Sequence, residues 1–148
     1  MNFKVLIIGE GSVGKASFIN ICKNKGFQNT GPLNTYLDIS TNHGNVRLLL
    51  TQSRTYEAGY DLDLIMYDSN NPSTMKILQI VPNNNVPKVV IRNKFDLVHK
   101  GKYPKVQQGT FTSRQYPYFN MSVKKLYGIN EVLMCVLKEL ISKDVELY

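Results

Sequence analysis

The sequence has no tryptophan, only two cysteines, and no apolar run near the roughly 18 residues that a membrane-spanning helix needs. Cys22 and Cys135 both stand among apolar neighbours in segments that favour helix, so neither a disulfide scaffold nor a zinc site is predicted. The first residues lack the basic and apolar regions of a signal peptide, and the last five contain no cysteine for a prenyl anchor. We expect a reduced, intracellular protein of the cytoplasm or nucleus, without a membrane anchor.

The chain also lacks a concentrated charge of one sign, although Lys and Arg (18) outnumber Asp and Glu (11) and give a formal net charge of +7. Such an excess can indicate nucleic-acid binding. The basic residues are spread along the chain, with one modest cluster at 99–105, and no aromatic RNA-binding motif or recognition helix accompanies them. We favour a solvated basic surface over a nucleic-acid site and expect no nucleic-acid partner.

Short apolar segments alternate with helical patterns along the 148 residues, of which 43% are hydrophobic, and this length predicts a single domain over 1–148. Strands are predicted at 3–8, 36–41, 46–50, 62–67, 86–92 and up to about 119, and helices at 17–25, 72–81 and 129–141. Residues 42–45 predict a hairpin turn. The alternation predicts an α/β fold with a mostly parallel sheet of about six strands, one antiparallel edge strand and helices on both faces.

A glycine-rich loop follows the first predicted strand. Residues 9–16 read GEGSVGKA and fit the phosphate-loop pattern G-x-x-x-x-G-K-[ST] except at the last position. The glycines let backbone N–H groups converge on phosphate oxygens, and the start of the following helix adds its dipole. The lysine would bring its charge to the β- and γ-phosphates. The predicted phosphate site comprises Gly11, Ser12, Val13, Gly14, Lys15, Ala16 and Ser17.

Two further polar segments follow later strands: residues 93–96 read NKFD, and residues 122–124 read SVK. Because ligands of such sheets bind beyond the carboxyl ends of the strands, we expect both segments to meet the phosphate loop at one site. Taken alone, Asp96 could be a cap in a polar loop. Placed after a phosphate loop, its carboxylate can accept hydrogen bonds from N1–H and the amino group of guanine, which adenine does not offer in that arrangement.

These three segments, in this order, resemble the small GTPase superfamily, and the resemblance covers nearly the whole chain with internal deletions. It implies a Ras-like P-loop GTPase fold and the binding of GDP or GTP. It also implies that guanine is bound by Phe27, Asn93, Lys94, Asp96, Ser122, Val123 and Lys124. Phe27 is equally compatible with a plain hydrophobic residue at a helix end. Residues 41–44 (TNHG) and 118–124 (YFNMSVK) are most similar to the Ran subfamily, which implies a Ran-type exchange factor or transport proteins as partners.

The chain differs from this superfamily at the positions that coordinate Mg²⁺ and orient the attacking water. Ala16 replaces the Ser or Thr that coordinates Mg²⁺, and Gln52 takes the place of the switch II aspartate, after which about ten residues are missing. Ser17 lies about 100° further round the helix and is a poor substitute. Thr30 resembles the switch I threonine, but its spacing is off by one, so it is a weak candidate metal ligand. We expect weak Mg²⁺ binding or none, and no catalytic residue.

Three functional hypotheses follow. The first is a Ran-like protein that binds guanine nucleotide, GDP better than GTP, with negligible hydrolysis, and that competes for Ran-type regulators or transport partners. The second is a nucleotide-free interaction module, because Arg92 and Val123 could crowd the base pocket. The third is an active GTPase with an unconventional metal site that uses Thr30 or Glu57.

Overall fold

The computed structural model describes residues 1–24, 26, 31–111 and 115–148. The strands are β1 (Asn2–Ile8), β2 (Asn34–Thr41), β3 (Gly44–Ser53), β4 (Leu62–Asp68), β5 (Lys88–Asn93), β6 (Gly109–Phe111) and β7 (Tyr116–Asn120). The helices are α1 (Lys15–Cys22), α2 (Ile77–Ile80) and α3 (Ile129–Leu140), with short 3-10 helices at Pro72–Lys76 and Phe95–Leu97. None of the helices in these described ranges is long and apolar enough to cross a membrane.

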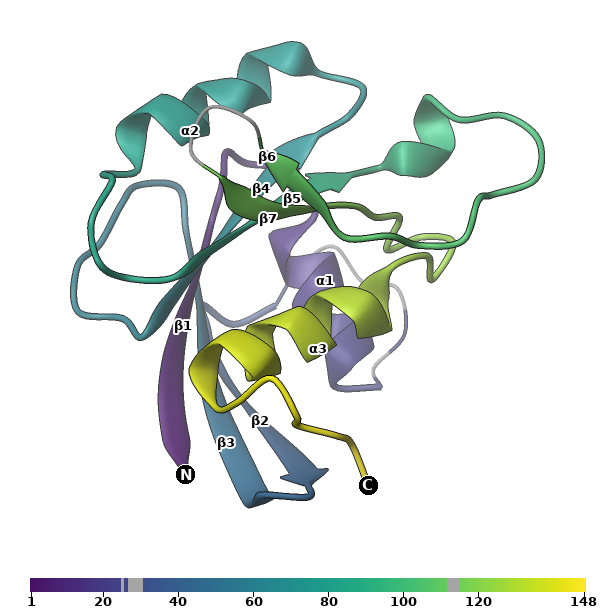
Figure 1. Ribbon diagram of the computed structural model, residues 1–148. Coiled ribbons are helices and arrows are strands. Elements are labelled where there is room, and N and C mark those ends of the chain that lie inside the picture. The colour runs from purple at the N-terminus through teal and green to yellow at the C-terminus, as the bar shows by residue number, and fades with distance from the viewer. Residues whose placement is uncertain (25, 27–30, 112–114) are drawn as a thin grey trace.

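One sheet joins the strands of the described residues, in the order β2-β3-β1-β4-β5-β7-β6 (Figure 1). The strands from β3 to β7 pair in parallel, and β2 and β6 are the antiparallel edges. The predicted α/β fold with a mostly parallel sheet is therefore confirmed. Its strand count was one too low, and its single antiparallel edge was wrong, because β6 is a three-residue strand that pairing with β7 defines rather than any pattern of its own.

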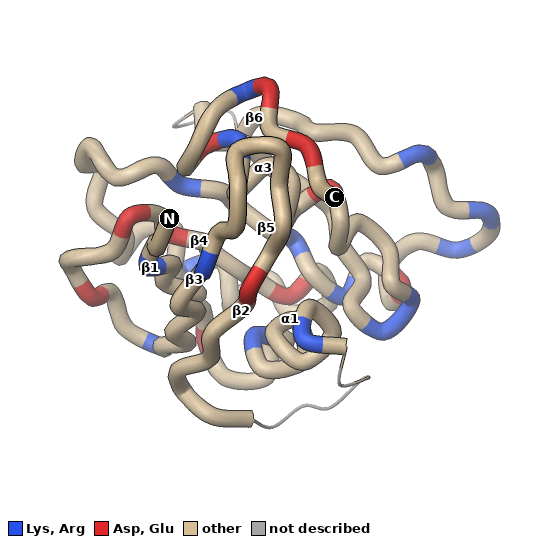
Figure 2. The backbone as a smooth tube through the Cα atoms, turned by 90° about the horizontal axis from the view of Figure 1, so that it is seen from below, with Lys and Arg blue, Asp and Glu red and all other residues tan. Residues whose placement is uncertain are grey.

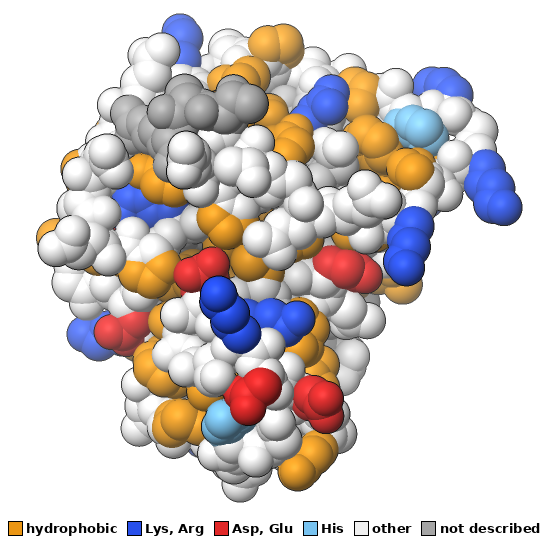
Figure 3. Space-filling view, in the orientation of Figure 1, with side chains coloured by type: hydrophobic (Ala, Val, Ile, Leu, Met, Phe, Trp, Pro, Cys, Tyr) orange, Lys and Arg blue, Asp and Glu red, His pale blue; other side chains and the backbone are white. Residues whose placement is uncertain are grey.

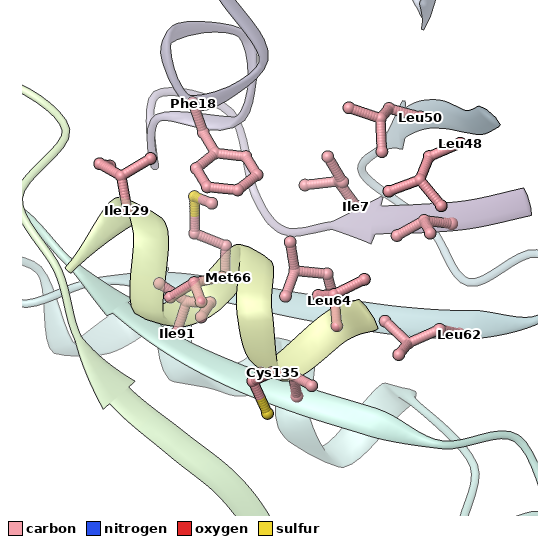
Figure 4. Close-up of a cluster of buried hydrophobic side chains, with 14 of the residues drawn as sticks. Ile7, Phe18, Leu48, Leu50, Leu62, Leu64, Met66, Ile91, Ile129 and Cys135 are labelled. Carbon is pink, nitrogen blue, oxygen red and sulfur yellow. The ribbon is translucent and has the colours of Figure 1, made fainter. Parts of the chain in front are cut away.

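The two faces of the sheet are covered by different helices. Alternate residues of the central strands point to opposite faces, so Ile7 packs in the cluster with α1 and α3, and Ile8 packs in the cluster with α2. Phe18 of α1 and Ile129 of α3 reach the same group of strand side chains (Figure 4). The predicted helices on both faces are confirmed, and the amphipathic stripe of the last helix lies in the larger cluster.

Several element boundaries differ from the prediction for local reasons. Helix α1 begins at Lys15 rather than at residue 17, because Gly14 adopts a left-handed conformation with φ 108° and lets the helix start at once. The predicted helix 72–81 is half 3-10, with one α-turn after it. The hairpin turn is tighter than predicted, since Thr41 pairs with Gly44 and only Asn42 and His43 remain between the strands.

A buried ion pair joins β4 and β5 near the strand ends remote from the phosphate loop. Lys88 Nζ lies 2.8 Å from Asp63 Oδ2, with side-chain exposures of 0% and 1%. The ammonium also donates to Asn84 Oδ1 (2.7 Å) and to the carbonyl of Val86 (3.1 Å), so each of its three N–H donors has an acceptor. Asp63 Oδ1 has no hydrogen-bond partner among the described residues, which leaves this carboxylate dependent on Lys88.

Lys88→Met should lower the free energy of unfolding by about 3–5 kcal/mol, because it leaves an uncompensated buried carboxylate. The double variant Asp63→Leu/Lys88→Met should recover most of that loss, since it removes both charges. Urea denaturation of the two variants and the wild type measures both effects. Equal instability of the single and double variants would contradict a dominant role for the unpaired charge.

Candidate functional site

The loop between β1 and α1 is shaped by glycines that no other residue can replace without movement. A Cβ at Gly9 would collide with the carbonyl oxygen of Met66, and one at Gly14 would collide with the side-chain amide of Asn93. Ser12 and Gly14 both have positive φ, 66° and 108°, which turns the backbone between strand and helix. The loop therefore has the close packing and left-handed turns of a phosphate loop ahead of a helix N-terminus.

Lys15 begins α1 and folds back over this loop. Its Nζ donates to the carbonyls of Gly9 (2.5 Å) and Glu10 (2.8 Å), and only 8% of the residue is exposed. Burial lowers the pKa of Lys15 to about 8, with a further lowering by the nearby Arg54 charge and an opposing contribution from Glu10. Below that pH the ammonium is charged and available to an anion.

Arg54 follows the end of β3 and lies against the phosphate loop. A Cβ built on Gly11 would meet the Nη2 and Cζ atoms of Arg54 at 2.7 and 2.9 Å, so the guanidinium rests beside that glycine. The sequence assigned no role to this residue, which follows Gln52 in the altered switch II segment. The only available signal was a basic residue where the superfamily pattern expects a switch loop.

Asn93, at the end of β5, joins the phosphate loop to the predicted base loops. Its Nδ2 donates to the carbonyl of Val13 (2.8 Å), and its Oδ1 accepts from the backbone N–H of Val123 (3.3 Å). Nearby, Ser122 Oγ donates to Asp96 Oδ1 at 2.6 Å, which fixes the orientation of that carboxylate. The structure thus brings the three predicted segments together, as the parallel sheet requires.

Two adjoining cavities lie over these loops and share Gly14, Ser17 and Lys94 in their walls. The larger, about 520 Å³, is lined by Gly11, Ser12, Gly14, Lys15, Ala16, Ser17, Leu33, Gln52, Ser53, Arg54 and Lys94. The smaller, about 170 Å³, is lined by Gly14, Ser17, Asn93, Lys94, Asp96, Leu97, Val123 and Lys124. The first surrounds the candidate phosphate residues and the second the candidate base residues, so one elongated ligand can span both.

The other residues that the sequence singled out fall into four groups. Lys94 is held by an ion pair with Asp68 (3.2 Å) while it lines both cavities. Val13 and Ser122 are buried behind the cavity walls and contribute through the hydrogen bonds described above. Phe27 and Thr30 lie outside the described residues. Arg92 pairs in register with Tyr67 on the face covered by α2, so the expectation that it crowds the base pocket is wrong.

The described residues fit a Mg²⁺ ion poorly. The Ala16 side chain offers no oxygen, and the Gln52 side-chain nitrogen donates to the carbonyl of Pro32 at 2.9 Å. Glu57 accepts from Tyr60 (3.4 Å) and does not line either cavity. No group of three or more His, Cys, Asp or Glu side chains able to hold a metal occurs in the part of the chain that the structure describes. Arg54, which carries a permanent positive charge, also lines the cavity in which the cation would have to bind.

The charges of the described residues outside these cavities are dispersed over the molecule. Lys and Arg occur on many separate segments, with Asp and Glu between them (Figure 2). The face in Figure 3 likewise shows basic, acidic and hydrophobic side chains intermixed. The two adjoining cavities remain the leading candidate site.

Comparison with known proteins agrees with this geometry at a coarse level. No family model matches the chain. It is similar to the Ras-related protein Rab7 of Drosophila melanogaster, with 25% identity over 170 aligned positions that cover 97% of this chain and 82% of that protein. The aligned positions outnumber the 148 residues here, so this chain has gaps against that relative. The match and the fold support the small GTPase superfamily, and they do not support the narrower Ran assignment.

Removing the Arg54 charge should raise the pKa of Lys15, because a nearby cation disfavours the ammonium form. In the wild type, Lys15 should titrate near pH 8 by NMR of its ¹³Cε–¹Hε signal, and in Arg54→Gln it should titrate at higher pH. Arg47→Gln, at the other end of β3, is the matched control and should leave the titration unchanged. An unshifted Lys15 in Arg54→Gln would show that the two charges do not interact.

Proposed function

We propose that this small-GTPase-like chain binds guanine nucleotide, GDP more tightly than GTP, and hydrolyses GTP negligibly. The observation that carries the proposal is the Asn93 side chain, which ties the phosphate loop at Val13 to the base loop at Val123. Through it, a phosphate cavity and a carboxylate-lined cavity share one wall. A nucleotide is the ligand whose anionic and heterocyclic ends match such a pair.

Asp96 supports guanine over adenine. One of its oxygens accepts from Ser122, and the residue lines the smaller cavity, where carboxylate lone pairs remain for N1–H and the exocyclic amine of guanine. An adenine base would leave the carboxylate without those donors, which is costly in a partly buried site. Lys94 and Lys124 line the same cavity, where their aliphatic stems can cover the base.

The preference for GDP follows from charge. A triphosphate carries one more negative charge than a diphosphate, and in this superfamily Mg²⁺ normally offsets it. Here Ala16 and the engaged Gln52 amide are poor ligands, so weak Mg²⁺ binding penalises GTP most. Hydrolysis also requires a side chain that orients the attacking water. Gln52 ends β3 with its amide on Pro32 and is not placed for that task.

Titration calorimetry should detect binding of GDP, weaker binding of GTP, and far weaker binding of ATP. Asp96→Ala should reduce GDP affinity by about 10- to 100-fold, the loss expected when hydrogen bonds to a charged group are removed. Asp38→Ala, an exposed carboxylate paired with Arg47 at the β2–β3 edge, is the control and should bind GDP as the wild type does. Equal affinities for ATP and GDP would contradict the guanine assignment.

GTP incubated with the protein and Mg²⁺ should release phosphate at a rate indistinguishable from that of a Lys15→Ala variant, because the chain lacks a positioned water-orienting residue. A malachite-green phosphate assay over hours measures both. Turnover that Lys15→Ala abolishes would instead support an active GTPase with an unconventional metal site.

One observation favours a second function, a nucleotide-free interaction module. The N–H of Val123, a residue that the superfamily resemblance assigns to guanine binding, donates instead to Asn93, and Val123 lines the small base cavity. A thermal shift on addition of GDP separates the two functions, since a ligand that binds only the folded state raises the melting temperature. For the nucleotide-binding function, we propose competition for Ran-type exchange factors or transport proteins in the cytoplasm or nucleus, on the resemblance of residues 41–44 and 118–124.

A further inference from the structure

Arg54 sits on a turn that is fixed to the phosphate loop. The carbonyl of Ser53 accepts from the backbone N–H of Gly9 at 3.1 Å. The Ser53 hydroxyl donates to the carbonyl of Thr55 (2.8 Å) and accepts from its N–H (3.1 Å). The backbone on both sides of Arg54 is therefore held, and the side chain starts from a defined point at the mouth of the larger cavity.

Arg54 is one of the residues that line this cavity. It rests beside Gly11 and shares the cavity with Lys15, close enough to disfavour the Lys15 ammonium. Within the described ranges, Arg54 makes no ion pair with a carboxylate. Two like charges that line one cavity repel each other until an anion lies between them. Such a pair suits a ligand with at least two negative oxygens.

We propose that Arg54 replaces Mg²⁺ as the second positive charge on the bound nucleotide, so that Lys15 and Arg54 together hold a diphosphate without metal. This inference rests on the proposed function and adds its charge-neutralising residue. A guanidinium can donate two parallel N–H bonds to one phosphate, which gives direction as well as charge. The poor fit of the described residues to Mg²⁺ and the position of Arg54 then have one explanation.

The replacement also accounts for the preference between nucleotides. Lys15 and Arg54 supply two fixed positive charges, and the loop N–H groups supply partial ones. They offset the diphosphate better than the more highly charged triphosphate. A divalent cation that entered the cavity would meet the Arg54 guanidinium and be repelled, so added Mg²⁺ cannot strengthen binding as it does at an oxygen-lined site.

The test is calorimetric titration of GDP and GMP into the full chain, once with excess EDTA and once with Mg²⁺. Wild-type protein should bind GDP equally well in both conditions. Arg54→Gln should weaken GDP about 10- to 100-fold in both, as expected for loss of a charged hydrogen-bond donor, and should leave the weaker GMP binding nearly unchanged. Arg47→Gln loses the same charge from an exposed site on β3, the strand that precedes Arg54, and should match the wild type.

Thermal melts without nucleotide should show that Arg54→Gln is as stable as the wild type, since the side chain is exposed. Failure of the proposed function and failure of the role of Arg54 would give different results. Wild-type protein that binds no GDP in either condition contradicts the proposed function and, with it, the role of Arg54. GDP binding that requires Mg²⁺, or that Arg54→Gln leaves unchanged, contradicts the role of Arg54 alone and leaves guanine-nucleotide binding in place.

Discussion

The site depends on one amide side chain, that of Asn93. Its nitrogen and oxygen bind backbone groups of two loops. Val13, in the first loop, is 80 residues from Asn93 in sequence, and Val123, in the second, is 30 residues from it. Gly14 has no Cβ because this amide lies where that atom would be. The bonds are buried, so each lost partner would leave a polar group unsatisfied away from water. The relative position of the phosphate and base cavities follows from this contact.

The candidate binding segments and the altered metal and water segments lie on different parts of the fold. The candidate base and phosphate segments lie at the carboxyl ends of β1, β5 and β7, where the sheet fixes them. The segments that the superfamily resemblance associates with metal and water belong to the connections after α1 and β3, and Arg54, in the second of them, lines the larger cavity. Loss of these connections leaves the sheet intact, since loops tolerate deletion better than paired strands.

Much of the fold could be read from local patterns. Residues 3–8 and 62–67 are short apolar runs before polar loops, and burial of both faces of β1 and β4 explains why. The apolar stripe over residues 129–141 predicted the bounds of α3 to within one residue. Strand β6 was not predictable, because only its pairing with β7 makes three residues a strand. The early start of α1 depended on the left-handed Gly14.

The sequence by itself determined which residues are candidates for a nucleotide site, because residue types at fixed spacing after strands restrict both chemistry and place. It could not show that Arg92 lies on the face of the sheet covered by α2, because the face on which a strand residue lies depends on its register with the neighbouring strand, here β4. It also could not show that the Val123 N–H meets Asn93, or that Arg54 lies beside Gly11 and Lys15. These contacts join residues far apart in the chain, and only packing of the loops on a common sheet edge decides them.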